Sequence, residues 1–124
     1  MPPTSSPTNP SCVLLSKDFL WGSRLCEAIK RRGHLVTMTA SLDNLSVSDP
    51  WQCIFIDLTL PTTTVEQVAN WKETLDPAPI LVAFGPHVQG SLLERAEQAG
   101  CDRVLTRGQM DQQIESLLDE LLTR

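Results

Sequence analysis

The sequence predicts an α/β fold in which five parallel strands form one doubly wound sheet with helices on both faces. Short apolar runs alternate with longer amphipathic segments, which is the pattern of parallel strands joined by helical crossovers. Residues 53–56 (CIFI) are apolar without interruption, as is typical of a strand buried on both faces of such a sheet. A chain of 124 residues, 41% of them hydrophobic, has the size and apolar content for one such domain.

The first half of the chain contributes three strands and one long helix. Residues 12–15 (CVLL) predict a short buried strand, and a helix is expected over residues 19–32, where Gly33 suits its end. Residues 35–40 (LVTMTA) alternate and are rich in β-branched side chains, which favours a second strand. The polar stretch 41–50 has room for only one helical turn before the central strand begins.

The second half alternates helices with two further strands. A helix is expected over residues 65–75, a buried strand over residues 80–84 (ILVAF) and a short strand over residues 103–106. Ser91 and Glu94 have capping-box spacing and start a helix that Gly100 ends. Asp111 is predicted to cap the final helix, whose apolar face comprises Ile114, Leu117, Leu118, Leu121 and Leu122.

The resulting element order is βαβ(α)βαβαβα, in which strands alternate with helices throughout. Five strands in a chain of this length predict the flavodoxin-like arrangement, with strand order 2-1-3-4-5.

Composition and charge exclude several classes of partner. The formal net charge is -5, from 15 acidic and 10 basic residues, whereas nucleic-acid binding needs a basic face. No apolar stretch is long enough to cross a bilayer, and residues 1–10 lack the charged and apolar regions of a secretory signal. We therefore expect no nucleic-acid or membrane partner, a disordered lead-in over residues 1–10 and one domain over residues 11–124.

Four scattered cysteines give no sign of a metal centre. They form no CxxC pair, and neither His34 nor His87 stands at a zinc-motif spacing from them. We interpret them as reduced core thiols of a cytoplasmic protein: Cys12, Cys26, Cys53 and Cys101.

A single carboxylate at the end of the central strand is the first candidate functional residue. Asp57 follows the apolar run directly, and Pro61 then stops the extended chain. Ligands of open α/β sheets bind beyond the carboxyl ends of the strands, so Asp57 is a candidate site. A helix cap or a turn residue would explain its position equally well.

From residue 12 to its end, the chain resembles the receiver domain of two-component response regulators. The segments IFIDLTLP and AGCDRVLTRGQ carry the resemblance, the first to the phosphoacceptor strand and the second to the last strand. The resemblance implies an acidic pair that helps to hold magnesium, an aspartate that accepts the phosphoryl group, a Ser or Thr switch residue and a phosphate-contacting Lys.

One part of that phosphoryl site matches the family pattern well. Asp57 falls on the phosphoacceptor position and Pro61 on the family's proline, but Ser16 and Lys17 fall where the acidic pair belongs. Asp18 lies one residue after the positions of that acidic pair. Because magnesium needs hard oxygen ligands, Asp18 and Asp57 are only weak metal candidates, and Lys17 is placed to neutralise Asp57 instead.

The other two positions also depart from the family. Phe84 falls on the switch position and has no hydroxyl to donate to a phosphoryl oxygen. Arg107 falls on the lysine position, where it remains a phosphate-contact candidate with a longer, planar group.

These departures favour an atypical receiver-like signalling domain that acts mainly by protein–protein contact. It would not be an enzyme and would need no cofactor, and Asp57 would pair with Lys17 or Arg107. The expected partner is a histidine kinase or another signalling protein, and a homodimer is possible. In the family, the surface formed by the fourth helix, fifth strand and fifth helix commonly binds partners. In this chain that surface would include Arg95, Gln98, Arg103 and Gln112. An ordinary solvated surface would explain each of these residues as well.

Two alternatives stay open. In the first, the domain is a working receiver that a histidine kinase phosphorylates on Asp57, with magnesium assisted by Asp18. In the second, it is a flavodoxin-like cofactor-binding domain or enzyme. The second alternative lacks a phosphate loop after the first strand, a GxGxxG motif and a GxSxG elbow.

Overall fold

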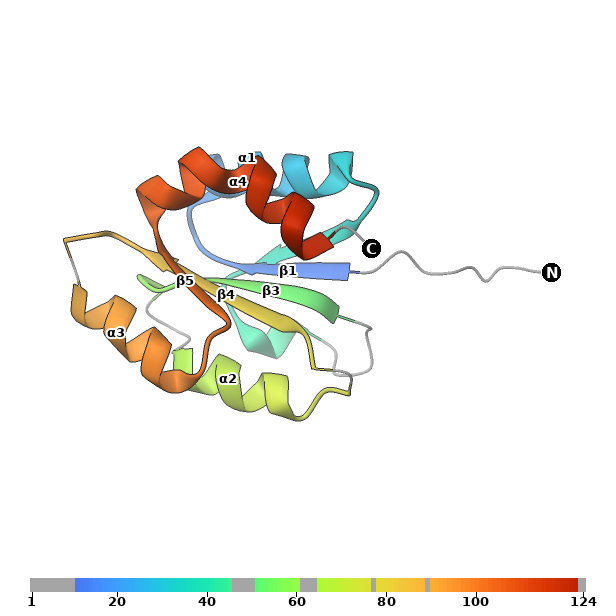
Figure 1. The fold of residues 1–124 in the computed structure, drawn as a ribbon. Coiled ribbons are helices and arrows are strands. Elements are labelled where there is room, and N and C mark those ends of the chain that lie inside the picture. Colours follow the sequence, from blue (N-terminus) through green and yellow to red (C-terminus); the bar gives the residue numbers. More distant parts are fainter. Residues whose placement is uncertain (1–10, 46–50, 61–64, 77, 89, 123–124) are drawn as a thin grey trace.

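A computed structural model describes residues 11–45, 51–60, 65–76, 78–88 and 90–122. The elements are shown in Figure 1 and are, in chain order, β1 (Ser11–Leu15), α1 (Phe19–Arg31), β2 (Leu35–Thr39), the 3-10 turn η1 (Leu42–Asn44), β3 (Trp51–Asp57), α2 (Val65–Glu73), β4 (Ile80–Gly85), α3 (Gly90–Ala99), β5 (Arg103–Thr106) and α4 (Arg107–Leu122). All four strand pairings are parallel, in the order β2-β1-β3-β4-β5. The predicted flavodoxin-like topology is confirmed. The predicted lead-in over residues 1–10 and Pro61 lie outside the described residues.

Helices cover both faces of the sheet, as Figure 1 shows, with α1 and α4 on one side and α2 and α3 on the other. Successive strand residues point to opposite layers, since Cys12 and Leu14 pack with α1 and α4 while Val13 and Leu15 pack with α2 and α3. Both faces are therefore apolar, which explains the uninterrupted hydrophobic strands of the sequence.

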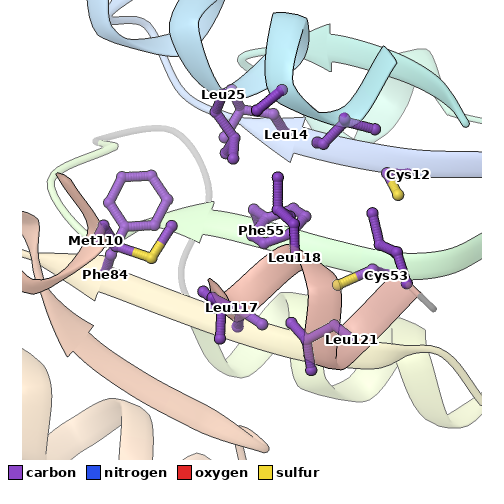
Figure 2. Close-up of a cluster of buried hydrophobic side chains, with 14 of the residues drawn as sticks. Cys12, Leu14, Leu25, Cys53, Phe55, Phe84, Met110, Leu117, Leu118 and Leu121 are labelled. Atoms are coloured by element: carbon purple, nitrogen blue, oxygen red, sulfur yellow. The ribbon is translucent and has the colours of Figure 1, made fainter. Parts of the chain in front are cut away.

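The larger core cluster lies between the sheet and the pair α1 and α4. Figure 2 shows Leu118 of α4 and Phe55 of β3 together in this cluster, with Leu14 and Leu25 above them. The apolar face predicted for the final helix is confirmed, since Leu117, Leu118, Leu121 and Leu122 are buried. This packing fixes α4, whose first residue is Arg107, against the sheet.

The predicted start of the final helix is wrong. The helix begins at Arg107, directly after β5, and Asp111 lies inside it rather than at its cap. Thr106 and Gln109 form a reciprocal capping box, in which the Gln109 backbone N–H donates to Thr106 Oγ1 at 3.0 Å and the Thr106 N–H donates to Gln109 Oε1 at 2.9 Å. Asp111 is instead bound by α1, because Trp21 Nε1 donates to its Oδ1 at 2.6 Å.

Other boundaries differ by one or two residues from the predicted ones. The first helix ends at Arg31, since Arg32 caps it and Gly33 adopts the left-handed conformation with φ of 82°. The helix α2 ends at Glu73, two residues early. The described part of the stretch between β2 and β3 contains only η1, in agreement with the single turn predicted there. Across the described residues, no helix combines the length and apolarity needed to cross a bilayer.

All four cysteines are free thiols. Cys12 and Cys53 are buried in the core, as predicted, whereas Cys26 and Cys101 are half-buried. Burial raises the pKa of Cys12 to about 12 and that of Cys101 to about 11. These two thiols therefore stay protonated, and hence poorly nucleophilic, at neutral pH.

Candidate functional site

The candidate site is built where β1 and β3 end side by side. Leu15 pairs with Ile56 in the parallel register, so the next residues, Ser16 and Asp57, emerge together at the carboxyl edge of the sheet. The Ser16 hydroxyl donates to Asp57 Oδ2 at 2.9 Å, and both residues are buried. Ser16, at a position where the resemblance expects an acidic ligand, is thus a hydrogen-bond donor to Asp57.

The second oxygen of Asp57 closes the turn that follows β3. Asp57 Oδ1 accepts from the Thr59 backbone N–H at 3.0 Å and from Thr59 Oγ1 at 2.7 Å. The Asp57 carbonyl also accepts from the Leu60 N–H at 3.0 Å. Asp57 is therefore a turn residue as well as a candidate site residue, and only 3% of its surface is exposed.

Arg107 links Asp57 to Asp18. Its Nη1 donates to Asp18 Oδ2 at 2.9 Å and its Nη2 lies 3.4 Å from Asp57 Oδ2. The exposed Lys17 lines the same cavity of about 290 Å³, but no ion pair joins it to Asp57 in the described part of the chain. Of the two cations that the sequence offered for Asp57, the structure pairs it with Arg107.

Two aromatic rings support the Arg107 guanidinium. Its central carbon lies 5.0 Å from the ring centroid of Trp21 and 5.8 Å from that of Phe84, within the range of cation–π attraction. The two rings pack on each other with centroids 4.7 Å apart. Phe84, at the predicted switch position, thus belongs to an apolar support for Arg107.

Asp18 is both a helix cap and a site residue. Its Oδ1 accepts from the Trp21 N–H at 3.1 Å, which caps α1, while Ser16 Oγ accepts from its own backbone N–H at 3.1 Å. The N–H of Trp21 and the guanidinium of Arg107 hold the pKa of Asp18 below its ordinary value of 3.8. The carboxylate is therefore ionised at neutral pH.

The lowered pKa of Asp18 predicts a defined pH dependence of stability. Because the folded pKa lies below the ordinary 3.8, the contribution of the ionised group is present above that pH and is lost as the pH falls through the folded value. We expect Asp18→Asn, which keeps a good N-cap, to be less stable than the wild type at pH 7, and the difference to shrink on acidification. Urea unfolding of both proteins from pH 7 downward measures it; a difference that grows on acidification would contradict the assignment.

The residues present do not fit a resident magnesium ion. Magnesium requires several oxygen ligands in octahedral geometry, usually including carboxylates. Here the two nearby carboxylates, Asp18 and Asp57, both bind Arg107, and Ser16 donates its hydroxyl proton to Asp57. Within the described ranges, no group of three or more His, Cys, Asp or Glu side chains is arranged to hold a metal ion.

Two contributors to the site were missed in the sequence. Thr59 stands two residues after Asp57, the spacing at which an aspartate side chain accepts from the backbone, so this turn had a local signal. Trp21 had none, because its contacts with Phe84 and Arg107 join three distant segments.

No protein-family model matches the sequence, and no curated protein matches it. Solved structures match its fold. One is a response regulator from Burkholderia pseudomallei with a phosphorylated aspartic acid, calcium ion and citrate (TM-score 0.74, 18% identity, 93% of this chain and 68% of that chain covered). Another is a receiver domain from Bermanella marisrubri (TM-score 0.75, 15% identity, 94% and 100% covered).

A third similar structure is the receiver domain of a Saccharomyces cerevisiae response regulator, crystallised with a histidine phosphotransfer signalling protein (TM-score 0.72, 14% identity, 93% of this chain and 90% of that chain covered). These matches span nearly the whole chain, with TM-scores of 0.72 to 0.75. The chain therefore has the fold of response regulator receiver domains.

Proposed function

We propose that the chain is an atypical receiver-like signalling domain, which acts mainly by contact with a protein partner and carries an incomplete phosphorylation site. The observation that carries this proposal is that both oxygens of the Asp57 carboxylate already accept hydrogen bonds within the protein. Ser16, Arg107 and two groups of Thr59 all donate to it. A phosphoacceptor must present a free oxygen lone pair to the donor, and here both oxygens of Asp57 already accept hydrogen bonds from other residues of the protein.

The groups around Asp57 also argue against efficient phosphoryl transfer. Phosphoryl transfer depends on cations that bridge the oxygens of the transferring group and neutralise its charge. Arg107 is a single monovalent charge already shared between Asp18 and Asp57, and Phe84 has no hydroxyl to donate. Phosphotransfer is therefore absent or weak in this proposal, and we assign the domain no enzymatic activity and a cytoplasmic location.

A protein partner has an exposed apolar surface available beside the site. Phe19 and Leu20, the first residues of α1, are 70% and 87% exposed and follow Asp18 directly. Large adjacent apolar side chains that remain in water are candidates for burial in an interface. Arg95 of α3 is bound by Glu66 of α2, and Arg103 of β5 is bound by Glu120 of α4, so both arginines engage neighbours within this chain. The expected partner is a histidine kinase, a phosphotransfer protein or another signalling protein.

A phosphodonor assay tests the proposal. The purified domain is incubated with acetyl phosphate, with and without Mg²⁺, and its intact mass is followed. We expect no Mg²⁺-dependent gain of a phosphoryl group, while a typical receiver treated in parallel gains one. Asp57→Asn serves as the control for modification at other residues.

One observation keeps the phosphoacceptor alternative in view. Asp57 lines the cavity of about 290 Å³ at the carboxyl edge of the sheet, so a small donor has a path toward it. Mg²⁺-dependent modification that disappears in Asp57→Asn would replace the proposed function with this alternative. The charged lining of that cavity, with Lys17, Asp18 and Arg107, differs from the largely apolar wall that holds most cofactors.

A further inference from the structure

We propose that Arg107 is the resident cation of the acidic pocket and that its guanidinium, by its presence, excludes divalent cations from Asp18 and Asp57. This inference deepens the proposed function, since it concerns the same pocket, but it makes a separate claim. It states that the capacity to bind a hard cation is masked by Arg107 rather than lost with the family's acidic pair.

The geometry around the guanidinium is that of a shared cation. Asp18 Oδ2 approaches it from the N-cap of α1 at 2.9 Å, and Asp57 Oδ2 approaches it from the end of β3 at 3.4 Å. Hydroxyl oxygens of Ser16 and Thr59 lie within hydrogen-bond distance of the Asp57 carboxylate. The two carboxylates that meet at the guanidinium are the hard oxygen donors that Mg²⁺ and Mn²⁺ prefer.

Independent contacts hold the guanidinium in that position. The stacked rings of Trp21 and Phe84 support it from the apolar side. The capping box between Thr106 and Gln109 fixes the first turn of α4, of which Arg107 is the first residue. Its position is thus preorganised by packing and does not depend on the two ion pairs alone.

A divalent ion cannot share the pocket with this arginine. Both would need the same carboxylate oxygens, and two cations at contact distance repel each other strongly in a partly buried site. The Asp57 side chain is 4% exposed, whereas those of Arg107 and Asp18 are 31% and 38% exposed, so water screens this repulsion only in part. Removal of the charge at Arg107 therefore leaves two carboxylates without their cation and a vacancy suited to a metal ion.

Three substitutions isolate the charge of Arg107. Arg107→Met keeps a long apolar stem that packs on Trp21 and Phe84 but removes the cation. Arg107→Lys keeps a cation at the same position. Arg95→Met removes one positive charge on the other helix pair, where Arg95 binds Glu66, and so controls for net charge.

The test is a titration of each protein with Mn²⁺, followed by the electron paramagnetic resonance signal of the free ion. We expect Arg107→Met to bind Mn²⁺ about tenfold or more tightly than the wild type, because an opposing charge has been removed. Arg107→Lys and Arg95→Met should behave as the wild type does. Addition of Asp18→Asn to Arg107→Met should abolish the gain.

Two results would overturn the inference. One is a wild type that binds Mn²⁺ as tightly as Arg107→Met, with binding lost in Asp57→Asn. The other is a folded Arg107→Met, checked by circular dichroism, that gains no affinity; Arg107→Gln provides a second neutral variant should the methionine variant not fold. Neither result depends on the phosphodonor assay, which uses the wild type alone, so failure of this inference and failure of the proposed function are distinguishable.

Discussion

Replacement of Phe84 by serine is expected to lower the free energy of unfolding by about 3–5 kcal/mol. Serine is a residue type that the resemblance to receiver domains leads one to expect here, yet the structure has no place for it. The Phe84 side chain is completely buried and packs on Trp21, with ring centroids 4.7 Å apart. Phe84→Ser would create a cavity beneath Arg107 and bury a hydroxyl.

Urea unfolding measures this effect, and the chain offers a matched control. Phe19 is 70% exposed at the start of α1, so Phe19→Ser makes the same chemical change without a buried cavity. We expect the control to change stability by about 0.5 kcal/mol or less. Equal losses in the two variants would show that Phe84 does not pack as described.

The substitution Leu118→Ala is expected to cost about 3 kcal/mol. Leu118 is fully buried between α4, α1 and the sheet, in the same cluster as Phe55 (Figure 2). Alanine would remove most of that side chain, and a helix held by contacts with both the sheet and α1 relaxes only partly into the space. Because alanine is the better helix former, any loss reflects packing rather than helix propensity.

Thermal or urea unfolding of Leu118→Ala is compared with that of Leu20→Ala. Leu20 lies on α1 and is 87% exposed, so the same truncation there removes almost no buried contact. We expect Leu20→Ala to leave stability within about 0.5 kcal/mol of the wild type. A small loss in Leu118→Ala would contradict the packing of α4 against the sheet.

The strands and the topology were predictable because their signals are local. The apolar runs of β1, β3 and β4 reflect burial on both sheet faces, and helices of the right length separate them. The start of the last helix was misplaced because Asp111 suggested a cap, while the Thr106–Gln109 capping box directly after β5 left no loop to mark the boundary. Both were capping signals, and only the tertiary contact of Asp111 with Trp21 shows which one the helix uses.

The candidate site was predictable only in part. Position at the end of the central strand identified Asp57, and the resemblance to receiver domains added Ser16 and Arg107, which the structure brings to the same edge of the sheet. The role of Phe84 could not be predicted from the sequence, which shows only that the hydroxyl of the switch residue is absent. The contacts of its ring with Trp21 and Arg107 appear only in the structure. Sequence indicated which groups are absent, whereas the structure identifies what has taken their place.

The direct junction between β5 and α4 has a mechanical consequence. Since no loop separates them, Arg107 and the buried residues near the far end of the helix belong to one rod of 16 residues, which extends about 24 Å. If the backbone of Arg107 shifts while this rod stays intact, Glu115 and Asp119 shift with it, and these two residues hold Arg32 at the end of α1. The ion pairs between α4 and α1 thus tie the position of the first turn of α4, which carries Arg107, to the far end of α1.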